Sequence, residues 1–238
     1  MRKQTITTAL LLIVLIQFVH AQPAPENRLI LFHTILSDVQ SSANIYTALD
    51  NGDDITSITN MGLAYYPSWS PDGSAILFVE ANDISQRIIL LNLEDKTQTE
   101  IISTDDERLN EGEISGFSFP IISPDMASIA FVATMSNEQQ TQDIFSLDLQ
   151  SGNLLRVTEN NFQEKHLQFS PNGSKLLFIS KTDTENQFFE YQIHIIDLTT
   201  QDTTIVPNNF PHDPISPKWI SDDSVVFISI IENWVVVK

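Results

Sequence analysis

The sequence predicts an all-β protein, a β-propeller built from four-stranded antiparallel blades. Three observations support this fold class: one phrase recurs at near-constant spacing, each copy contains four short β-rich runs, and no stretch has the apolar spacing of a helix. A period near 50 residues is typical of propellers or solenoids and not of tandem globular domains. With 238 residues, of which 42% are hydrophobic, the chain can bury a sizeable core.

The recurring phrase is centred on a turn that contains Asp or Asn. It reads YPSWSPDGSAILFVE from Tyr66, FPIISPDMASIAFVA from Phe119 and HLQFSPNGSKLLFIS from His166, with a looser copy, SPKWISDDSVVFIS, from Ser216. The turn residues Asp72, Asp125, Asn172 and Asp222 are therefore 53, 47 and 50 residues apart. Each copy is interpreted as the inner half of one blade.

The first strand of each blade is expected to end at Trp69, Ile122, Phe169 or Trp219, just before the turn. In the turn, Pro71 presets φ and Gly73 accepts a positive φ, so Gly73 and Gly173 are predicted to be left-handed. The residues assigned a structural role in the turns are Trp69, Pro71, Asp72, Gly73, Pro124, Asp125, Pro171, Asn172, Gly173, Trp219 and Asp222.

The other strands follow in the same order in every copy. AILF, SIAF, KLLF and SVVF are predicted second strands, RIILLNL, DIFSLDL and YQIHIIDL third strands, and TEII, LLRVT and TTIV fourth strands. Before the first copy, LILFHTI, ANIYTAL and ITSIT resemble strands two to four of a blade, and ENWVVVK resembles a third strand. The chain therefore contains about four and a half blades, near 28–60, 64–103, 115–158, 165–206 and 215–238.

One copy carries a specific family signature. Trp69-Ser70-Pro71-Asp72-Gly73, followed by Ile76 and Phe78, resembles the WD40-like repeat of the TolB-type β-propeller family. The other copies depart from it: Met126 replaces Gly, Asn172 replaces Asp, and the fourth copy lacks the Pro. The resemblance covers residues 28–238 and implies six blades, so the alternatives are a truncated product, an incomplete six-blade ring and a five-blade ring closed by pairing of its ends.

The first 21 residues have the three parts of a secretory signal. Arg2 and Lys3 precede the apolar run TALLLIVLIQFV, and Val19-His20-Ala21 supplies the cleavage pattern. The run of about 12 residues is too short for a membrane span of about 20. We therefore expect a Sec-type signal peptide cleaved after Ala21 and a periplasmic or secreted propeller domain, 22–238, without stable membrane insertion; an uncleaved anchor is the alternative.

Composition excludes several classes of function. The chain has 31 acidic and 12 basic residues, a net charge of −19, so nucleic acid is a poor partner. It has no cysteine, which excludes disulfides, thiol nucleophiles and thiolate metal sites. G-x-S-x-G elbows, phosphate loops, dinucleotide fingerprints and paired zinc histidines are absent from the sequence. No catalytic residue, metal or cofactor is predicted, and the chain is expected not to be an enzyme.

Two acidic segments are interpreted as loops. The segment 50–54 has the clustered oxygens of a calcium loop but lacks its bidentate Glu, and Asn-Gly is a strong hairpin signal. The segment 104–113 is interpreted as a solvated loop, with a partner-facing acidic patch as the alternative.

The candidate binding residues lie on the predicted innermost strands. Four residues share one repeat position, three before the end of that strand: Tyr66, Phe119, His166 and Ser216. Because ligands often bind at the mouth of a propeller channel, the predicted contact ring is Tyr65, Tyr66, Phe119, His166, His212 and Lys218. Packing between blades is the alternative role, and His33 and His194 are assigned to the core or to surface strands.

Three functions remain open. The resemblance favours an exported module that binds a protein, or a peptidoglycan-associated partner, through one face of the propeller. A second possibility is the propeller portion of a prolyl-oligopeptidase-like exopeptidase whose catalytic domain is not in this sequence. The third is a metal-dependent propeller lyase for acidic sugars; after signal removal the net charge would be −21, which opposes an anionic substrate.

Overall fold

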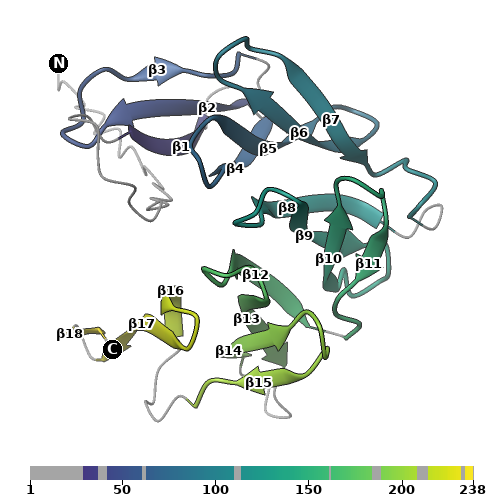
Figure 1. Cartoon of the computed structure of the whole chain (residues 1–238), viewed down its shortest axis with the longest axis vertical. Coiled ribbons are helices and arrows are strands. Elements are labelled where there is room, and N and C mark those ends of the chain that lie inside the picture. Colours follow the sequence, from purple (N-terminus) through teal and green to yellow (C-terminus); the bar gives the residue numbers. More distant parts are fainter. Residues whose placement is uncertain are drawn as a thin grey trace, which may run out of the picture.

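The computed structural model describes residues 29–36, 42–60, 63–109, 114–160, 162–183, 189–207, 214–231 and 234–237. In these ranges the chain forms 18 β-strands and no helix, arranged as five separate antiparallel sheets (Figure 1). The predicted all-β class is confirmed. None of these residues belongs to a helix that could cross a bilayer. The predicted signal sequence and His212 lie outside the described residues.

Three sheets have four strands that follow one another in chain order. The first contains β4 (Ala64–Trp69), β5 (Ala75–Ala81), β6 (Gln86–Asn92) and β7 (Gln98–Ser103). The second contains β8 (Ile114–Ile122), β9 (Ser128–Met135), β10 (Gln142–Asp148) and β11 (Leu154–Arg156). The third contains β12 (Gln163–Phe169), β13 (Lys175–Asp183), β14 (Phe189–Asp197) and β15 (Thr203–Ile205). These are the predicted four-stranded blades.

A three-stranded sheet flanks the complete blades on each side. One consists of β1 (Leu29–Leu36), β2 (Ser42–Leu49) and β3 (Thr56–Ser57), and the other of β16 (Pro214–Ser221), β17 (Ser224–Ile231) and β18 (Trp234–Val237). Strands β4, β8, β12 and β16 follow one another around the centre of the molecule, and β1 adjoins β4 (Figure 1). Within the described part of the chain, β1–β3 do not touch β16–β18. The described sheets therefore form an open arc, not a five-blade ring closed by pairing of its ends.

The Ser-Pro-Asp turn is held by its own side chains. Asp72 Oδ1 accepts hydrogen bonds from Ser70 Oγ at 2.7 Å and from the Ser74 amide at 3.0 Å. The Ala75 amide in turn donates to Ser70 Oγ at 2.9 Å. The same bonds recur in the next two blades, from Ser123 to Asp125 and from Ser170 to Asn172. These hydrogen bonds hold the pKa of Asp72 below its usual value and explain why the repeat needs Ser and Asp two residues apart.

The glycine position of the turn is left-handed, as predicted. Gly73 has φ of 73° and Gly173 has φ of 77°, and Met126, which occupies the same position in the second repeat, has φ of 62°. No atom lies within 4 Å of a Cβ built on Gly73, so only the backbone conformation disfavours a side chain there. Met126 therefore adopts a conformation that is strained for its residue type.

We expect Gly73→Val to lower the free energy of unfolding by roughly 1 kcal/mol or more, because a β-branched residue is disfavoured at positive φ. Met126→Gly should raise it by a similar amount, and Gly73→Asn should cost less than valine because Asn tolerates this region. Urea denaturation of the three variants measures the order of their stabilities. A denaturation midpoint unchanged by Gly73→Val would contradict the assigned turn.

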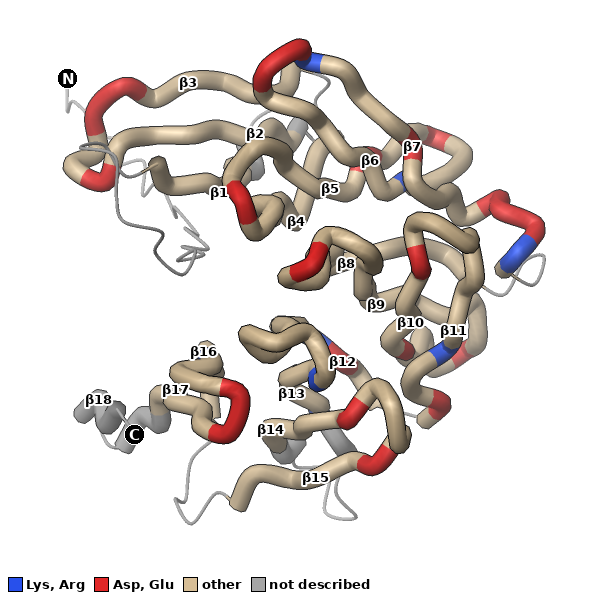
Figure 2. Tube along the Cα trace, viewed as in Figure 1, with Lys and Arg blue, Asp and Glu red and all other residues tan. Residues whose placement is uncertain are grey.

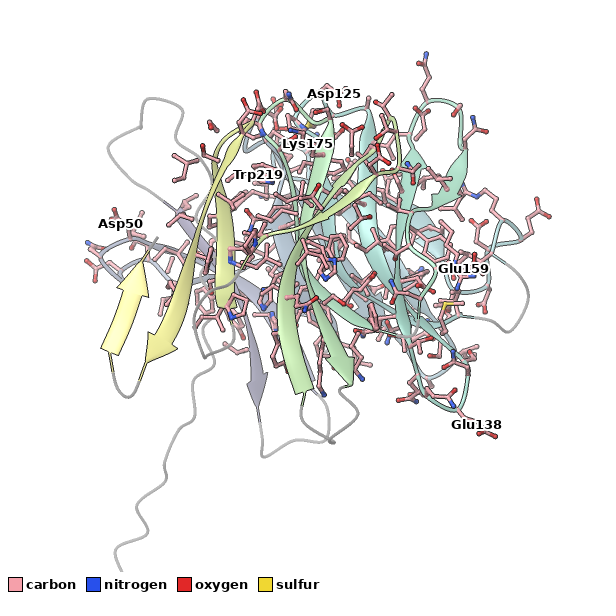
Figure 3. The ribbon with its side chains drawn as sticks, turned by 90° about the horizontal axis from the view of Figure 1, so that it is seen from below. Asp50, Asp125, Glu138, Glu159, Lys175 and Trp219 are labelled. Atoms are coloured by element: carbon pink, nitrogen blue, oxygen red, sulfur yellow. The ribbon has the colours of Figure 1, made fainter. Side chains whose placement is uncertain are left out.

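The fourth copy of the repeat differs from the other three. Strand β16 continues past Trp219 to Ser221, and Asp222 and Asp223 form a two-residue turn, so Trp219 does not end its strand as predicted. Asp222 Oδ1 accepts a hydrogen bond from the backbone amide of Asn172 at 2.8 Å, whereas Asp72 accepts its hydrogen bonds within its own turn. Asp222 therefore links two neighbouring blades. In the side view, Asp125 and Lys175 mark one edge of the sheets, and Glu138 lies at the opposite edge (Figure 3).

The hydrophobic cores lie mainly between adjacent sheets. The second strand of each repeat contributes one buried phenylalanine: Phe78, Phe131, Phe178 and Phe227. Around Phe131, side chains from the sheets β4–β7 and β8–β11 meet in one cluster. Because each blade buries one face against its neighbour, the positions of the innermost strands are fixed by this packing.

Candidate functional site

A β-bulge with a left-handed residue occurs on every innermost strand that carries the repeat. The register between strands one and two shifts at 65–68, 118–121, 165–168 and 215–218. The left-handed residues are Tyr66 at φ 51°, Phe119 at 51°, His166 at 59° and Ser216 at 50°. Positive φ is uncommon for residues other than glycine, and bulges re-aim side chains. The repeat thus presents one side chain per blade in the same local geometry.

Aromatic rings at these bulges form a continuous row across neighbouring blades. The ring centroids of Tyr66 and Phe119 are 4.8 Å apart, and those of Phe119 and His166 are 5.5 Å apart. On the other side, His33 of β1 lies 5.9 Å from Tyr66 and 6.3 Å from Tyr65. These separations are typical of interacting aromatic pairs. We call His33, Tyr65, Tyr66, Phe119 and His166 the inner row.

The structure brings most of the predicted contact ring together. Tyr65, Tyr66, Phe119 and His166 belong to the inner row, and Lys218 on β16 is close enough to His166 for its charge to act on the imidazole. His212 lies outside the described residues. His33, predicted to be a core or surface-strand residue, lies half-buried on β1, and its ring adjoins those of Tyr65 and Tyr66. The repeat gave no signal for His33, because its contact with Tyr66 arises only where β1 adjoins the innermost strand β4.

The inner row also contributes to packing between blades, the alternative role predicted for it. Tyr66 packs against the cluster that contains Leu77 and Phe117, and Phe119 packs against the next cluster, which contains Leu167. Each member of the row is only half-buried. One part of the Tyr66 and Phe119 rings therefore supports the blades while another part remains accessible.

Hydrogen bonds between innermost strands hold the row in place. Ser68 Oγ donates to the Pro120 carbonyl at 2.6 Å, which joins β4 to β8. Gln168 Nε2 donates to the Pro217 carbonyl at 2.6 Å, which joins β12 to β16. Because these bonds fix the spacing of the strands next to the bulges, the row is a preorganised surface.

The two histidines of the row have lowered pKa values. Burial, followed by the positive charges of Lys165 and Lys218, lowers the pKa of His166 to about 4. Burial alone lowers the pKa of His33 and of Lys218. His166 is therefore a neutral imidazole near pH 7, able to donate one hydrogen bond and accept another. Lys165 places its Nζ 3.9 Å from the centroid of the Tyr191 ring.

The acidic segments form turns. In 50–54 the Asp53 amide donates to Asn51 Oδ1 at 2.9 Å, Asn51 Nδ2 donates to Asp53 Oδ2 at 2.9 Å, and Gly52 has φ of 88°. In the second segment, Asp106 pairs with Arg108 at 2.7 Å, and Arg108 donates to the Gly152 carbonyl at 3.1 Å. Residues 110–113 lie outside the described part. The described residues contain no group of three or more His, Asp or Glu placed to hold a metal ion.

Comparisons with known proteins found one curated relative and several similar solved structures. No family model matches the chain. A TolB homolog of Chlorobium luteolum is 28% identical over 161 residues, which cover 67% of this chain and 32% of that protein. The structure of TolB from Acinetobacter baumannii matches with a TM-score of 0.51 and 18% identity, covering 87% of this chain and 59% of that one.

An oligogalacturonate lyase from Vibrio parahaemolyticus matches with a TM-score of 0.61 and 13% identity, covering 88% of this chain and 58% of the lyase. At such identities the solved structures show the fold alone. The chain spans about a third of the length of the curated TolB relative and under two thirds of the length of these two solved structures.

Proposed function

Because the chain contains a β-propeller of the TolB type, as its repeat predicted, we propose that it is an exported protein-interaction module of the periplasm or cell envelope. The partner binds along the inner row. The observation that carries this proposal is the uninterrupted contact of rings from β1, β4, β8 and β12. Export rests on the N-terminal sequence pattern, with Ala21 as the last residue removed.

The inner row has the properties of a protein contact surface. Binding energy in protein interfaces concentrates in a few partly enclosed aromatic residues, of which Tyr and Trp are the most frequent. The rings of the row are held by interblade packing and by two interstrand hydrogen bonds, so little entropy is lost when they are covered. The left-handed backbone at Tyr66 and Phe119 is a conformation often found at ligand-binding sites.

A lyase acting on acidic sugars is the second candidate. Neutral His166 beside Lys218 has the chemistry of a general base next to a cation, and one structural neighbour is an oligogalacturonate lyase. Against it, the chain has a net charge of −19, which repels a polyanionic substrate. The protein-binding function is therefore preferred.

Tyr66→Ala and His166→Ala should each weaken capture of the partner about tenfold or more, as truncation of an interface anchor does. Tyr46→Ala is the matched control, because Tyr46 is a half-buried ring of β2 that stacks on Phe32 at 5.8 Å and lies outside the row. Capture from periplasmic or culture extract by crosslinking, followed by mass spectrometry, measures the effect. Denaturant unfolding checks that each variant still folds cooperatively.

Equal capture by wild type and all three variants would contradict the proposal. Peptidase and polyuronate-lyase assays on the same proteins accompany the capture experiment. Turnover that disappears in His166→Ala but persists in Tyr46→Ala would replace the binding function with the enzymatic one.

A further inference from the structure

Half of the lysines and arginines in the described part of the chain are paired with carboxylates. Eight of the 12 lysines and arginines are described, and four of them form ion pairs: Arg87 with Glu80 and Glu100, Arg108 with Asp106, Arg156 with Asp143 and Glu159, and Lys175 with Asp223. In a chain with 31 acidic residues such pairing is the expected outcome. Half-buried Lys218 is an exception, since no described carboxylate lies within 4.0 Å of its ammonium group.

Lys218 lies at the end of the inner row. In the first three repeats the left-handed position carries a ring, but in the fourth it carries Ser216, which is exposed and too small to extend the row. Lys218 follows the same bulge and lies near His166, whose neighbour Lys165 adds a second positive charge. The row of rings therefore ends in a cationic corner formed by His166 and Lys218.

Unlike this corner, the turns and peripheral loops of the protein are acidic. Asp and Glu residues are concentrated on the turns and peripheral loops (Figure 2). Burial lowers the pKa of Lys218, because its ammonium group has lost hydration, and among the described residues no carboxylate lies within 4.0 Å of it. An anion that reaches such a site gains more from the ion pair than it would at an exposed lysine, because the local dielectric is lower.

We propose that the corner formed by His166 and Lys218 binds a single carboxylate of a protein segment whose adjacent apolar side chain packs on Phe119 and Tyr66. This inference rests on the proposed protein-binding function and adds the chemistry of the partner. One carboxylate beside an apolar group matches one cationic corner beside a row of rings. A polyanion would place its other charges against acidic turns and be repelled.

The test uses two small probes that differ only in charge. N-acetyl-phenylalaninate carries a carboxylate beside a ring, and N-acetyl-phenylalaninamide is its neutral counterpart. NMR titration should show the carboxylate binding about tenfold more tightly than the amide, with the His166 side-chain signals shifting. Lys218→Gln should remove this preference, whereas Lys218→Arg and the control Lys96→Gln, which changes an exposed lysine of another blade, should retain it.

Equal affinity for the two probes, undetectable binding of both, or a preference that survives Lys218→Gln would overturn the proposal. Tighter binding of digalacturonate than of the monocarboxylate would also overturn it, in favour of a sugar ligand. The partner capture experiment distinguishes failure of the carboxylate proposal from failure of the protein-binding function. If Tyr66→Ala loses the partner while Lys218→Gln keeps it, the carboxylate proposal fails and the binding function stands; if every variant keeps the partner, the function itself fails.

Discussion

Replacing Phe131 with alanine is expected to lower the free energy of unfolding by about 3–5 kcal/mol, the usual cost of removing a buried phenylalanine. Phe131 has no exposed surface and lies on the second strand of the central blade. Its ring centroid is 5.2 Å from that of Phe117 and 5.9 Å from that of Phe145. Alanine would remove both ring contacts and leave a cavity between two blades, which close packing cannot fill by small shifts.

Leu155→Ala is the control, because Leu155 is also an apolar residue of this blade but is 50% exposed on β11. It should change the free energy of unfolding by less than about 0.5 kcal/mol. Guanidinium denaturation of both variants gives the comparison. Similar destabilisation by the two substitutions would mean that the blade is not packed around Phe131.

Glu164 should make the stability of the protein depend on pH. Its carboxyl group is fully buried at the start of β12, where it accepts hydrogen bonds from Thr158 Oγ1 at 2.7 Å and Asn160 Nδ2 at 2.8 Å. Burial, opposed by these hydrogen bonds and reinforced by the negative charge of Asp143, raises its pKa to about 7. Asp143 itself pairs with Arg156 at 2.6 Å.

The sign of the effect follows from proton binding. Unfolded, Glu164 ionises near 4.5, whereas the folded protein keeps the proton until about pH 7. Between these values the folded state binds the extra proton, so the free energy of unfolding falls as pH rises, by an amount on the order of 3 kcal/mol for this group. Glu164→Gln should abolish this loss and be more stable than wild type above about pH 7, where ionised Glu164 is costly.

The measurement is the difference in the free energy of unfolding between Glu164→Gln and wild type, taken at intervals from about pH 4 to 8. A difference is needed because His166 acts in the opposite direction. Its folded pKa of about 4 lies below the usual 6.5, so it costs stability as pH falls through that range. Parallel curves for the variant and wild type would show that Glu164 does not titrate differently in the two states.

The repeat made the blades predictable from the sequence. Ser70, Asp72 and Gly73 act through neighbours two to five residues away, so their turn bonds and the left-handed glycine could be inferred without knowing the rest of the fold. The alternation of β-rich runs and polar turns likewise placed the strands, because hairpin pairing is local in the chain.

Features that depend on contacts between blades were harder to predict from the sequence. His33 meets Tyr66 only because β1 adjoins β4, and Asp222 reaches Asn172 across a blade boundary. The buried arrangement of Glu164 near Asp143 joins two sheets in the same way. The repeat position predicted that Tyr66, Phe119 and His166 would be equivalent, but the register shift that turns them into one row comes from the bulges.

The central claim is that the partner covers the inner row, and the side-chain NMR signals of the histidines test it most directly. His33 and His166 belong to the row, whereas His194 is buried on β14, where it stacks on Phe178 at 5.2 Å. Titration with the captured partner should shift the His33 and His166 signals and leave those of His194 unchanged. Binding that shifts neither His33 nor His166 would contradict the claim.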